Sequence, residues 1–412
     1  MLNVLLNAYA VSPLWGSEQG MGWNWVTNIG RYCHVDVITE GEWRDDIERA
    51  LQSIDHKDNI TFHYLPVSHE VRRMCWNQGD WRFYWHYRRW QKRALAKARE
   101  ICSAKRIDIV HQLNMIGFRE PGFLWKIKDI PFVWGPIGGM DLMPEAYLVD
   151  APLNQRLFNK LKNRINKFQY LHSSRVRKTI TRSSALISAV KGVEDVLRNV
   201  YHRDSILINE TGIDSAHGNI KRADNRDGKF KVLWVGKFDF RKQLPLAMKA
   251  IAATNNDDIE FHICGTGSDS TVLEMKTLAR ELGINSQCHW HGNVPHDEIG
   301  GLMTYAHLFL FTSIMDATST VVLEAIAAGL PVLCFNTCGF GPIVNDFAGI
   351  TIELSNPTKS ITDFAIEINR LYNNRNLIVE ISQKINTKRD SLTWDSKARQ
   401  TVDIYRSLMF GN

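Results

Sequence analysis

Short strand-like runs of apolar residues alternate with helical segments along the whole chain, and this alternation limits the fold more than any other feature. In the first half the runs are Val4 to Leu6, Val35 to Ile38, Ile107 to His111, Phe132 to Trp134 and Ala185 to Ala189. Strands that alternate with helices form a parallel sheet covered by helices. The sequence therefore predicts an α/β protein built on doubly wound parallel sheets.

The alternation stops at a polar segment, residues 219–228, and begins again with Lys231 to Gly236. The later runs are Ile259 to Cys264, Cys288 to His291, Leu308 to Thr312 and Pro331 to Phe335, and segments such as Ser270 to Leu282 between them have helical character. A chain of 412 residues suits two domains of about 200 residues each. We expect a first domain over 1–205, a second over 206–393, and a helix over 394–412 that can return to the first domain.

The composition is that of a globular protein, with 44% hydrophobic and 23% charged residues. No apolar stretch approaches the roughly 20 residues that a helix needs to cross a bilayer. Residues 1–7 read as a first strand, without a basic leader or a cleavage site. The 7 cysteines are scattered and lack the paired spacing of a zinc site. We expect reduced thiols, no bound metal and a cytoplasmic location.

Two carboxylates eight positions apart, Asp316 and Glu324, flank the start of a predicted helix. The residues Thr318 to Thr320 can cap a helix, an apolar run follows them, and Gly-Leu-Pro at 329–331 would end it. The start of such a helix favours a phosphate. The carboxylates suit the hydroxyl groups of a sugar or ribose. The pattern indicates a sugar nucleotide; the alternative is a loop carboxylate and a solvated helix carboxylate.

A basic turn follows the first predicted strand of the second domain. Lys237 and Lys242 stand just beyond the carboxyl end of that strand, where ligands of open α/β sheets bind. Two cations at this place can neutralise a departing diphosphate. The alternative is a solvated basic loop, since Arg241 adds a third charge. We favour the functional interpretation because the turn precedes the carboxylate motif.

Four places carry a family resemblance together: the glycine-rich segment 16–23 (GSEQGMGW), the basic segment 236–242 (GKFDFRK), the loop 264–267 (CGTG) and Asp316-x7-Glu324. With them, nearly the whole chain resembles the retaining glycosyltransferases of family 4. The resemblance implies the GT-B fold, in which two Rossmann-like domains face a central cleft that holds the active site.

The resemblance also implies roles for individual residues. Lys237 and Lys242 would stabilise the leaving diphosphate, and Asp316 would contact the donor sugar. His111 would lie near the transferred sugar, whereas without the resemblance a packed histidine is the better interpretation. The expected donor-binding residues are Gly16, Ser17, Gly236, Gly265, Val294, Thr318, Ser319, Thr320 and Glu324, the last on the ribose.

The chain departs from the family pattern within the carboxylate motif. The family usually has Glu at both ends, whereas here the first is Asp316, whose side chain is shorter by roughly 1.5 Å. Residues 317–320 read Ala-Thr-Ser-Thr where the family commonly has a Gly-Phe-Gly stretch. The choice of donor therefore cannot be carried over from the family.

Aromatic and basic residues are dense in two parts of the first domain. Residues 72–93 combine arginines and lysines with Trp76, Trp81, Trp85 and Trp90, and residues 151–193 contain no Asp or Glu but many Lys and Arg. Such segments attract anionic membrane surfaces. The alternative is aromatic packing with solvated cations, and no nucleic-acid fold signature accompanies the charge.

The sequence thus predicts a retaining hexosyltransferase that uses a nucleotide diphosphate sugar and acts on a glycan or lipid-linked glycan in cell-surface polysaccharide biosynthesis, such as that of lipopolysaccharide. The chain contains no Asp-x-Asp sequence, so we expect metal independence and no cofactor. One rival is a nucleotide-sugar epimerase or a sugar phosphorylase on the same fold. Another is a non-catalytic sugar-nucleotide- or glycan-binding subunit that supports a partner enzyme.

Overall fold

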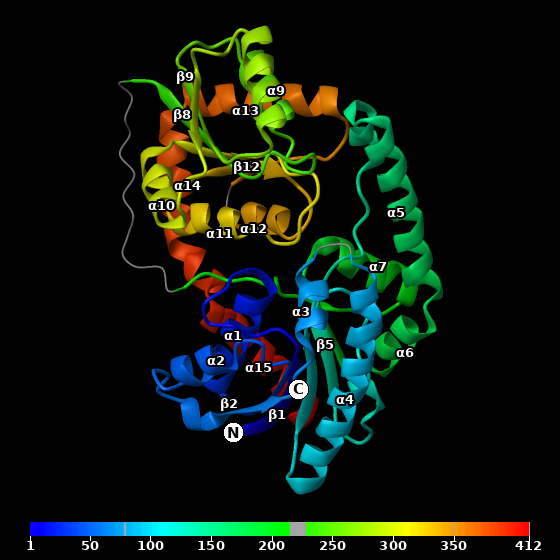
Figure 1. Cartoon of the computed structure of the whole chain (residues 1–412). Helices are drawn as coiled ribbons and strands as arrows, with labels where there is room; N and C mark the ends of the chain where they lie inside the picture. Colours follow the sequence, from blue (N-terminus) through cyan, green and yellow to red (C-terminus); the bar gives the residue numbers. More distant parts are fainter. Residues whose placement is uncertain (78–79, 215–227, 348, 412) are drawn as a thin grey trace. The chain divides into compact units, whose positions relative to one another are not determined.

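The computed structural model describes residues 1–77, 80–214, 228–347 and 349–411 (Figure 1). Nearly all of the polar segment that separates the two predicted domains, residues 219–227, lies outside the described residues. By its internal contacts the chain divides into two compact units. Unit 1 comprises residues 1–140, 165–211 and 394–412, and unit 2 comprises residues 141–164 and 212–393.

Unit 1 contains a seven-stranded parallel sheet with the strand order β3-β2-β1-β4-β5-β6-β7. Its strands are β1 (Leu2–Ala8), β2 (Cys33–Thr39), β3 (Ile60–Tyr64), β4 (Ile109–Asn114), β5 (Phe132–Ile137), β6 (Ala185–Ser188) and β7 (Ile206–Leu207). The chain builds outward from β1 on one side and from β4 on the other. The order therefore reverses between β1 and β4.

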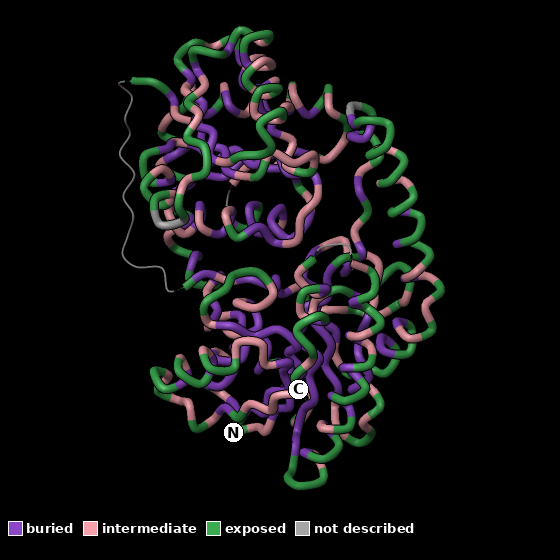
Figure 2. Tube along the Cα trace, in the orientation of Figure 1, coloured by how far each residue is buried: buried purple, intermediate pink, exposed green. Residues whose placement is uncertain are grey.

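Helices cover both faces of this sheet. They are α1 (Ser17–Gly30), α2 (Arg44–Leu51), α3 (His69–Trp76), α4 (Arg82–Ala104), α6 (Ser174–Arg182), α7 (Lys191–Tyr201) and α15 (Trp394–Phe410). Strand β1 is apolar on both sides because Val4 and Leu6 join a core with α1, α2 and α15, whereas Leu5 joins a core with α3, α4, α6 and α7. Figure 2 shows the strands buried while the outer helix faces are exposed. Helix α5 (Leu153–His172) contributes residues to both units.

Unit 2 contains a six-stranded parallel sheet with the order β10-β9-β8-β11-β12-β13. Its strands are β8 (Phe230–Val235), β9 (Ile259–Cys264), β10 (Cys288–Gly292), β11 (Leu308–Phe311), β12 (Val332–Phe335) and β13 (Ile350–Ile352). Its helices are α8 (Leu244–Ala253), α9 (Asp269–Glu281), α10 (His296–Tyr305), α11 (Thr320–Ala327), α12 (Phe340–Asp346), α13 (Pro357–Asn373) and α14 (Arg375–Lys388). Figure 1 shows α9 and α13 on one face of the sheet and α10, α11 and α12 on the other.

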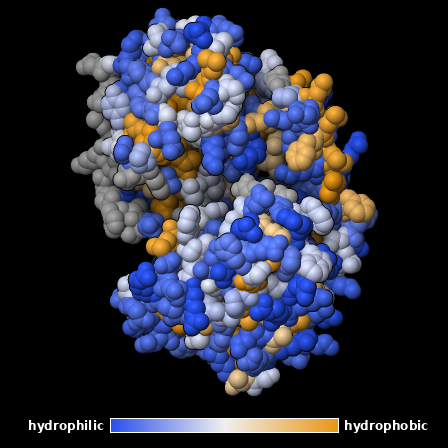
Figure 3. Space-filling model, in the orientation of Figure 1, coloured by the Kyte–Doolittle hydropathy of each residue, from blue (hydrophilic) through white to orange (hydrophobic). Residues whose placement is uncertain are grey.

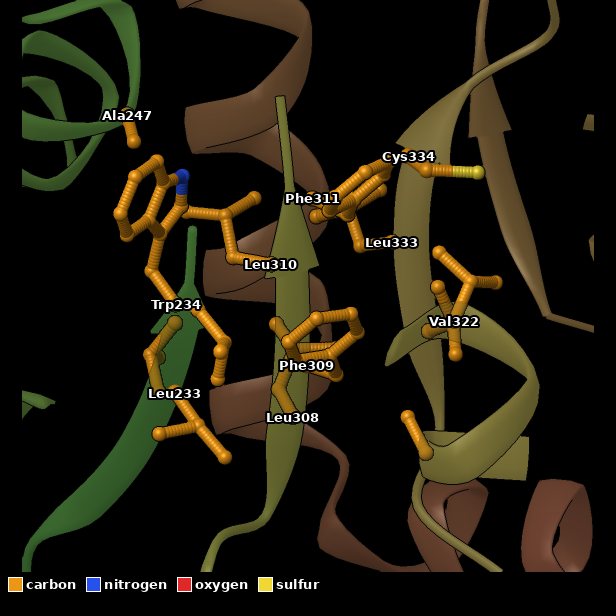
Figure 4. Close-up of a cluster of buried hydrophobic side chains, with 14 of the residues drawn as sticks. Leu233, Trp234, Ala247, Leu308, Phe309, Leu310, Phe311, Val322, Leu333 and Cys334 are labelled. Atoms are coloured by element: carbon orange, nitrogen blue, oxygen red, sulfur yellow. The ribbon is translucent and has the colours of Figure 1, made fainter. Parts of the chain in front are cut away.

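The core of unit 2 is built where β8, β11 and β12 lie side by side. Trp234, Phe309 and Phe311 are fully buried there, with Val322 of α11 packed against the strands (Figure 4). Every residue of β11 and β12 is buried, as expected for central strands covered on both faces. The predicted fold class, with two doubly wound parallel sheets, is confirmed.

The last helix, α15, packs within unit 1. Its Trp394 ring lies 6.4 Å from the Trp25 ring of α1, measured between centroids, and the Tyr405 side chain is fully buried. The sequence expectation for residues 394–412 left open whether this helix returns to the first domain. In the structure the helix belongs to unit 1, although unit 2 precedes it in the chain.

Candidate functional site

The strand order of unit 2 reverses between β8 and β11. At such a reversal the loops that follow the two central strands diverge to opposite faces of the sheet, and ligands of open α/β proteins bind there. The loop after β8 carries Lys237 and Lys242, and the loop after β11 carries Asp316. The topology therefore brings together two motifs that lie far apart in sequence.

Lys242 and Asp316 form an ion pair at this point. The distance from Lys242 Nζ to Asp316 Oδ2 is 2.5 Å, and the side chains are 14% and 20% exposed. The ammonium also lies 4.8 Å from the centre of the buried Phe311 ring. The pair is thus partly withdrawn from water, where charge interactions are stronger than at an open surface.

Backbone and side-chain hydrogen bonds hold the two loops together. Thr312 Oγ1 donates to the Lys242 carbonyl at 2.8 Å and accepts a hydrogen bond from Trp234 Nε1 at 3.1 Å. The Ile314 N–H donates to the Arg241 carbonyl at 2.9 Å. Within the first loop, Asp239 Oδ1 accepts from the N–H groups of both Arg241 and Lys242. These hydrogen bonds therefore fix the backbone from which the Lys242 side chain extends.

The glycines at the ends of β8, β9 and β10 lie against one another. The Gly236 N–H donates to the Cys264 carbonyl at 3.0 Å, and the Gly265 N–H donates to the Gly292 carbonyl at 2.7 Å. Gly265 has a φ of +141°, and a Cβ atom there would lie 1.8 Å from the Gly236 oxygen. Only glycine fits at position 265, which explains the first glycine of the CGTG loop.

Helix α11 begins at Thr320, with Ser319 as its N-cap, so the predicted start within Thr318 to Thr320 is confirmed. The Leu330 N–H donates to the Ala325 carbonyl beyond the left-handed Gly329, so the predicted stop is confirmed too. The Ser319 side chain makes no capping hydrogen bond within the helix. The helix start follows Asp316 by four residues.

The remaining predicted donor residues differ in exposure. Thr318 and Ser319 are buried, Glu324 and Val294 are half-buried, and Lys237 is exposed. Asp316 is fixed from a third loop, since its backbone N–H donates to Cys338 Sγ at 3.2 Å. Unit 2 thus gathers Gly236, Lys242, Gly265, Asp316 and the start of α11 at the carboxyl ends of its strands.

His111 occupies a different setting from the one that the resemblance implies. It is fully buried in β4, with Nδ1 2.6 Å from the Tyr405 hydroxyl oxygen and Nε2 2.7 Å from the Gly135 carbonyl oxygen. Burial lowers the pKa of His111 to about 4, although the Gly135 carbonyl opposes the shift. Both ring nitrogens are engaged within the core of unit 1. The expected place of His111 near the transferred sugar stays a prediction.

The glycine-rich segment of unit 1 lies at its own strand-order reversal, between β1 and β4. Gly16 is the N-cap of α1 with open space around its Cα, and Ser17 has a φ of +57°. Gly22 packs on the preceding loop, because a Cβ there would lie 2.2 Å from the Ala10 oxygen. The segment therefore combines an exposed start with glycines required for close packing.

Glu18 is the residue that the sequence interpretation missed at this place. Its Oε1 accepts a hydrogen bond from the Ile116 N–H at 3.2 Å, whereas its Oε2 is buried without a hydrogen-bond partner. Burial raises the pKa of Glu18 to about 7, against the Ile116 hydrogen bond and with a smaller contribution from Glu210. The sequence shows the carboxylate within the motif, but it does not show that the segment after β4 covers it.

The aromatic and basic segment 72–93 is only partly a surface. Phe83, Tyr87 and Trp90 are buried in the core of unit 1, whereas Trp81, Tyr84 and Trp85 are exposed. Several of its arginines are also engaged, as Arg72 pairs with Glu40 and Arg88 with Glu120. Helix α4 turns one side of the segment inward, so only the opposite side is exposed, and the contact of this segment with a membrane stays a prediction.

Helix α5 presents the larger apolar surface. Its exposed apolar side chains are Leu153, Leu157, Phe158, Leu161, Ile165 and Phe168. The polar Asn163 and Asn166 are buried instead, and Asn163 bonds both the N–H and the carbonyl of Met143. The apolar atoms are visible along α5 in Figure 3. None of the helices among the described residues is both long and apolar enough to cross a membrane.

Comparison with known proteins finds similarity to glycosyltransferases. Residues 218–388, less than half of the chain, match the family model of Glycosyl transferases group 1. An uncharacterized glycosyltransferase of Methanocaldococcus jannaschii is 26% identical over 192 residues, which are 45% of this chain and 46% of that protein. The lipopolysaccharide glucosyltransferase WaaG of Escherichia coli is 36% identical over 115 residues, 28% of this chain and 30% of WaaG. The chain spans less than half the length of either relative.

A solved glycosyltransferase from Rickettsia africae has the same fold over its whole length. The TM-score is 0.62 at 15% identity, and the match covers 100% of this chain and 99% of that one. The comparisons support the GT-B fold and a relationship to glycosyl transferases group 1. These similarities concern the fold and the group, not the particular family, the stereochemistry or the substrates.

Proposed function

We propose that this protein is a retaining glycosyltransferase of family 4, which moves a hexosyl group from a nucleotide diphosphate sugar to a glycan or lipid-linked glycan. The observation that carries the proposal is the Lys242–Asp316 pair beside the glycines at the strand ends of unit 2. A cation, a sugar-binding carboxylate and a helix start at one strand-order reversal match the parts of a sugar nucleotide.

In this proposal Lys242 and Lys237 stabilise the charge that develops on the leaving diphosphate. Asp316 holds Lys242 when no donor is bound, and the backbone amides at the start of α11 accept part of the phosphate charge. Glu324 binds the ribose hydroxyls. The bond from the anomeric carbon to the diphosphate oxygen breaks while the acceptor hydroxyl oxygen bonds to the same face of the sugar, and the hydroxyl proton passes to the departing diphosphate, so the configuration is retained. Catalysis is electrostatic and positional, and the cations take the place of a metal ion.

The acceptor side of the proposal uses α5. Its exposed apolar side chains stand beside the basic residues Lys160, Lys162, Arg164 and Lys167 of the same helix. An amphipathic helix of this composition lies in the interface of an anionic membrane, where each basic residue contributes about 1 kcal/mol. The enzyme would act there as a peripheral protein of the cytoplasmic face, on a lipid-linked acceptor of a surface polysaccharide such as lipopolysaccharide.

The proposal is tested first by donor binding. Calorimetry with UDP, GDP, ADP and their sugars should show selective binding of one nucleotide sugar, and Lys242→Ala and Glu324→Ala should each weaken it. Arg241→Ala is the matched control, because this cation lies beside Lys242 in the same loop and pairs with Asp239 at 3.0 Å. The proposal fails if no nucleotide sugar binds, or if the three variants behave alike.

The selected donor then serves in transfer assays with lipid-linked acceptors. Product anomers read by NMR decide the stereochemistry, and transfer should continue in the presence of a chelator. A supporting subunit would bind the donor without turnover on any acceptor. A phosphorylase would require free phosphate, and an epimerase would convert the donor without an acceptor.

A further inference from the structure

A cluster of imidazole and carboxylate groups lies on one face of the β9–β10 pair in unit 2. One ligand atom from each of Glu260, His262 and His289 lies within 4.8 Å of the others. Residues two apart on a strand share a face, and His262 pairs directly with His289 across the strands. His291 therefore lies on the same face as the other three.

The two ring nitrogens of His262 have different surroundings. Nδ1 lies 3.0 Å from His291 Nε2, which is hydrogen-bond distance between the two rings. Nε2 is buried without a hydrogen-bond partner, and the residue as a whole is only 7% exposed. A buried imidazole nitrogen without a partner is costly, since such groups are almost always hydrogen-bonded or bound to a metal.

The atom that His262 Nε2 faces is a carboxylate oxygen. Glu260 Oε2 lies 3.5 Å away. If His262 Nδ1–H donates to His291, then Nε2 presents a lone pair toward an acceptor, and the two lone pairs repel unless a cation lies between them. A neutral imidazole is the commonest metal ligand among protein side chains.

From this geometry we infer a binding site for a divalent transition cation of the Zn²⁺ type, with Glu260, His262 and His289 as ligands and His291 as the partner that orients His262. Zinc is bound by His and Glu at about 2.0–2.2 Å, which sets neighbouring ligand atoms about 3.4 Å apart. The separation of Glu260 Oε2 and His262 Nε2 already suits this arrangement. His289 is exposed, and its ring stacks on the His262 ring with 4.7 Å between the centroids, so it lies beside the same point.

The inferred site is independent of the proposed transfer reaction. It lies on β9 and β10, and none of its ligands belongs to the loops that carry Lys242 and Asp316. β10 is the edge strand of the sheet, and a shared ion would tie it to β9. A hydrogen bond between His262 Nδ1 and His291 Nε2 is the kind of outer contact that fixes the tautomer of a metal-binding histidine.

The test is a metal titration of the full-length protein after dialysis against a chelator. Calorimetry with Zn²⁺ should show one saturable site, and His289→Ala should abolish it. This variant changes an exposed side chain, so its fold can be verified by circular dichroism. His34→Ala is the matched control, because His34 is an exposed strand histidine of β2 outside the cluster. His291→Ala should weaken binding by about 10–100-fold, as expected for loss of an orienting partner.

The absorption spectrum of the Co²⁺-bound protein identifies the types of ligand atoms. A site of nitrogen and oxygen ligands gives visible bands without the thiolate charge-transfer band that cysteine ligands give in the near ultraviolet. The inference is overturned if Zn²⁺ binds the wild type and His289→Ala equally, if His34→Ala loses binding as well, or if the Co²⁺ spectrum shows thiolate ligation. Absence of a saturable site in the wild type overturns it too.

Discussion

Lys242 Nζ lies 2.5 Å from Asp316 Oδ2, although 74 positions separate the two residues in the sequence. The contact exists because β8 and β11, which precede them, are neighbours at the reversal of strand order in unit 2. Asp316 holds the Lys242 side chain beside the backbone of Gly236. In the proposed donor complex a diphosphate takes the place of Asp316 as the partner of Lys242, and the backbone of the loop stays as it is. The pair is therefore the centre of the proposed donor site.

Lys242→Ala should lower kcat for sugar transfer by about 100-fold or more, because a fixed positive charge at the leaving group is lost. Steady-state kinetics with a saturating donor measure this effect. Arg241→Ala should stay within about threefold of the wild type, since exposed surface charges have small effects. An equal loss of kcat in both variants would show that sugar transfer depends on the total positive charge of the loop and not on the position of Lys242.

A double-mutant cycle should reveal coupling between the pair in the stability of the protein. Lys242→Ala and Asp316→Ala each leave a partly buried charge without its partner, whereas the double variant removes both. We expect a coupling free energy of unfolding of about 1 kcal/mol or more. Urea denaturation of the four proteins measures it. Strict additivity would mean that the ion pair contributes nothing to the folded state.

Gly265→Ala should destabilise the protein by several kcal/mol, because the new Cβ would lie 1.8 Å from the Gly236 oxygen. Gly283→Ala provides the comparison: Gly283 also has a positive φ, +73°, but no atom lies within 4 Å of the added Cβ. That variant should lose only about 1 kcal/mol. Thermal unfolding of both variants separates the clash from the backbone strain, and similar losses would contradict the close approach of the two loops.

Glu18 should make the stability of the wild type fall as pH rises from about 4 to about 7. Its folded-state pKa is raised to about 7, above the value of about 4.3 in an unfolded chain, so the folded state binds the proton more tightly. The stabilisation is complete below the lower value and is lost as pH passes the higher one.

The measurement is the difference in unfolding free energy between the wild type and Glu18→Gln at pH 5 and pH 8. Glutamine keeps an oxygen to accept from Ile116 and cannot ionise. Relative to the wild type, the variant should gain a few kcal/mol at pH 8. A difference that does not change with pH would show that Glu18 ionises normally.

Replacement of Leu157 and Phe168 of α5 by serine should abolish binding to vesicles that contain anionic lipids. Both side chains are exposed, at 68% and 64%, and their burial in the interface supplies the apolar part of the affinity. Leu273→Ser is the control, since Leu273 is a similarly exposed leucine of α9. Vesicle co-sedimentation at low and high salt checks the prediction. Binding that survives the double substitution would move the membrane contact away from α5.

The strands that the sequence predicted and those that it missed differ in position. The central strands of both sheets are continuous apolar runs, because helices cover them on both faces, and each was predicted near its observed bounds. The missed strands β3, β7 and β13 all lie at sheet edges. These edge strands are less buried than the inner strands, as in Ile60–Tyr64, where only Ile60 is buried. Their sequences therefore carry little strand signal.

The site residues show a similar limit. The helix start after Asp316 was predictable because capping residues, an apolar run and a glycine stop are local signals. The engagement of His111 by Tyr405 was not, since its partner comes from a helix 294 positions later. The Glu260–His262–His289 cluster was missed for the same reason, as strand pairing and not sequence spacing brings its members together.

The place of α15 in unit 1 has a consequence for biosynthesis. Tyr405 closes the core around His111, and Trp394 packs against Trp25, so this core is incomplete until residues 394–405 have left the ribosome. All of unit 2 is synthesised before that moment. The face of the β1–β7 sheet that α1, α2 and α15 cover together therefore stays incompletely covered until the last helix is made, and any premature stop in that helix would leave the earliest-made part of the protein unfinished.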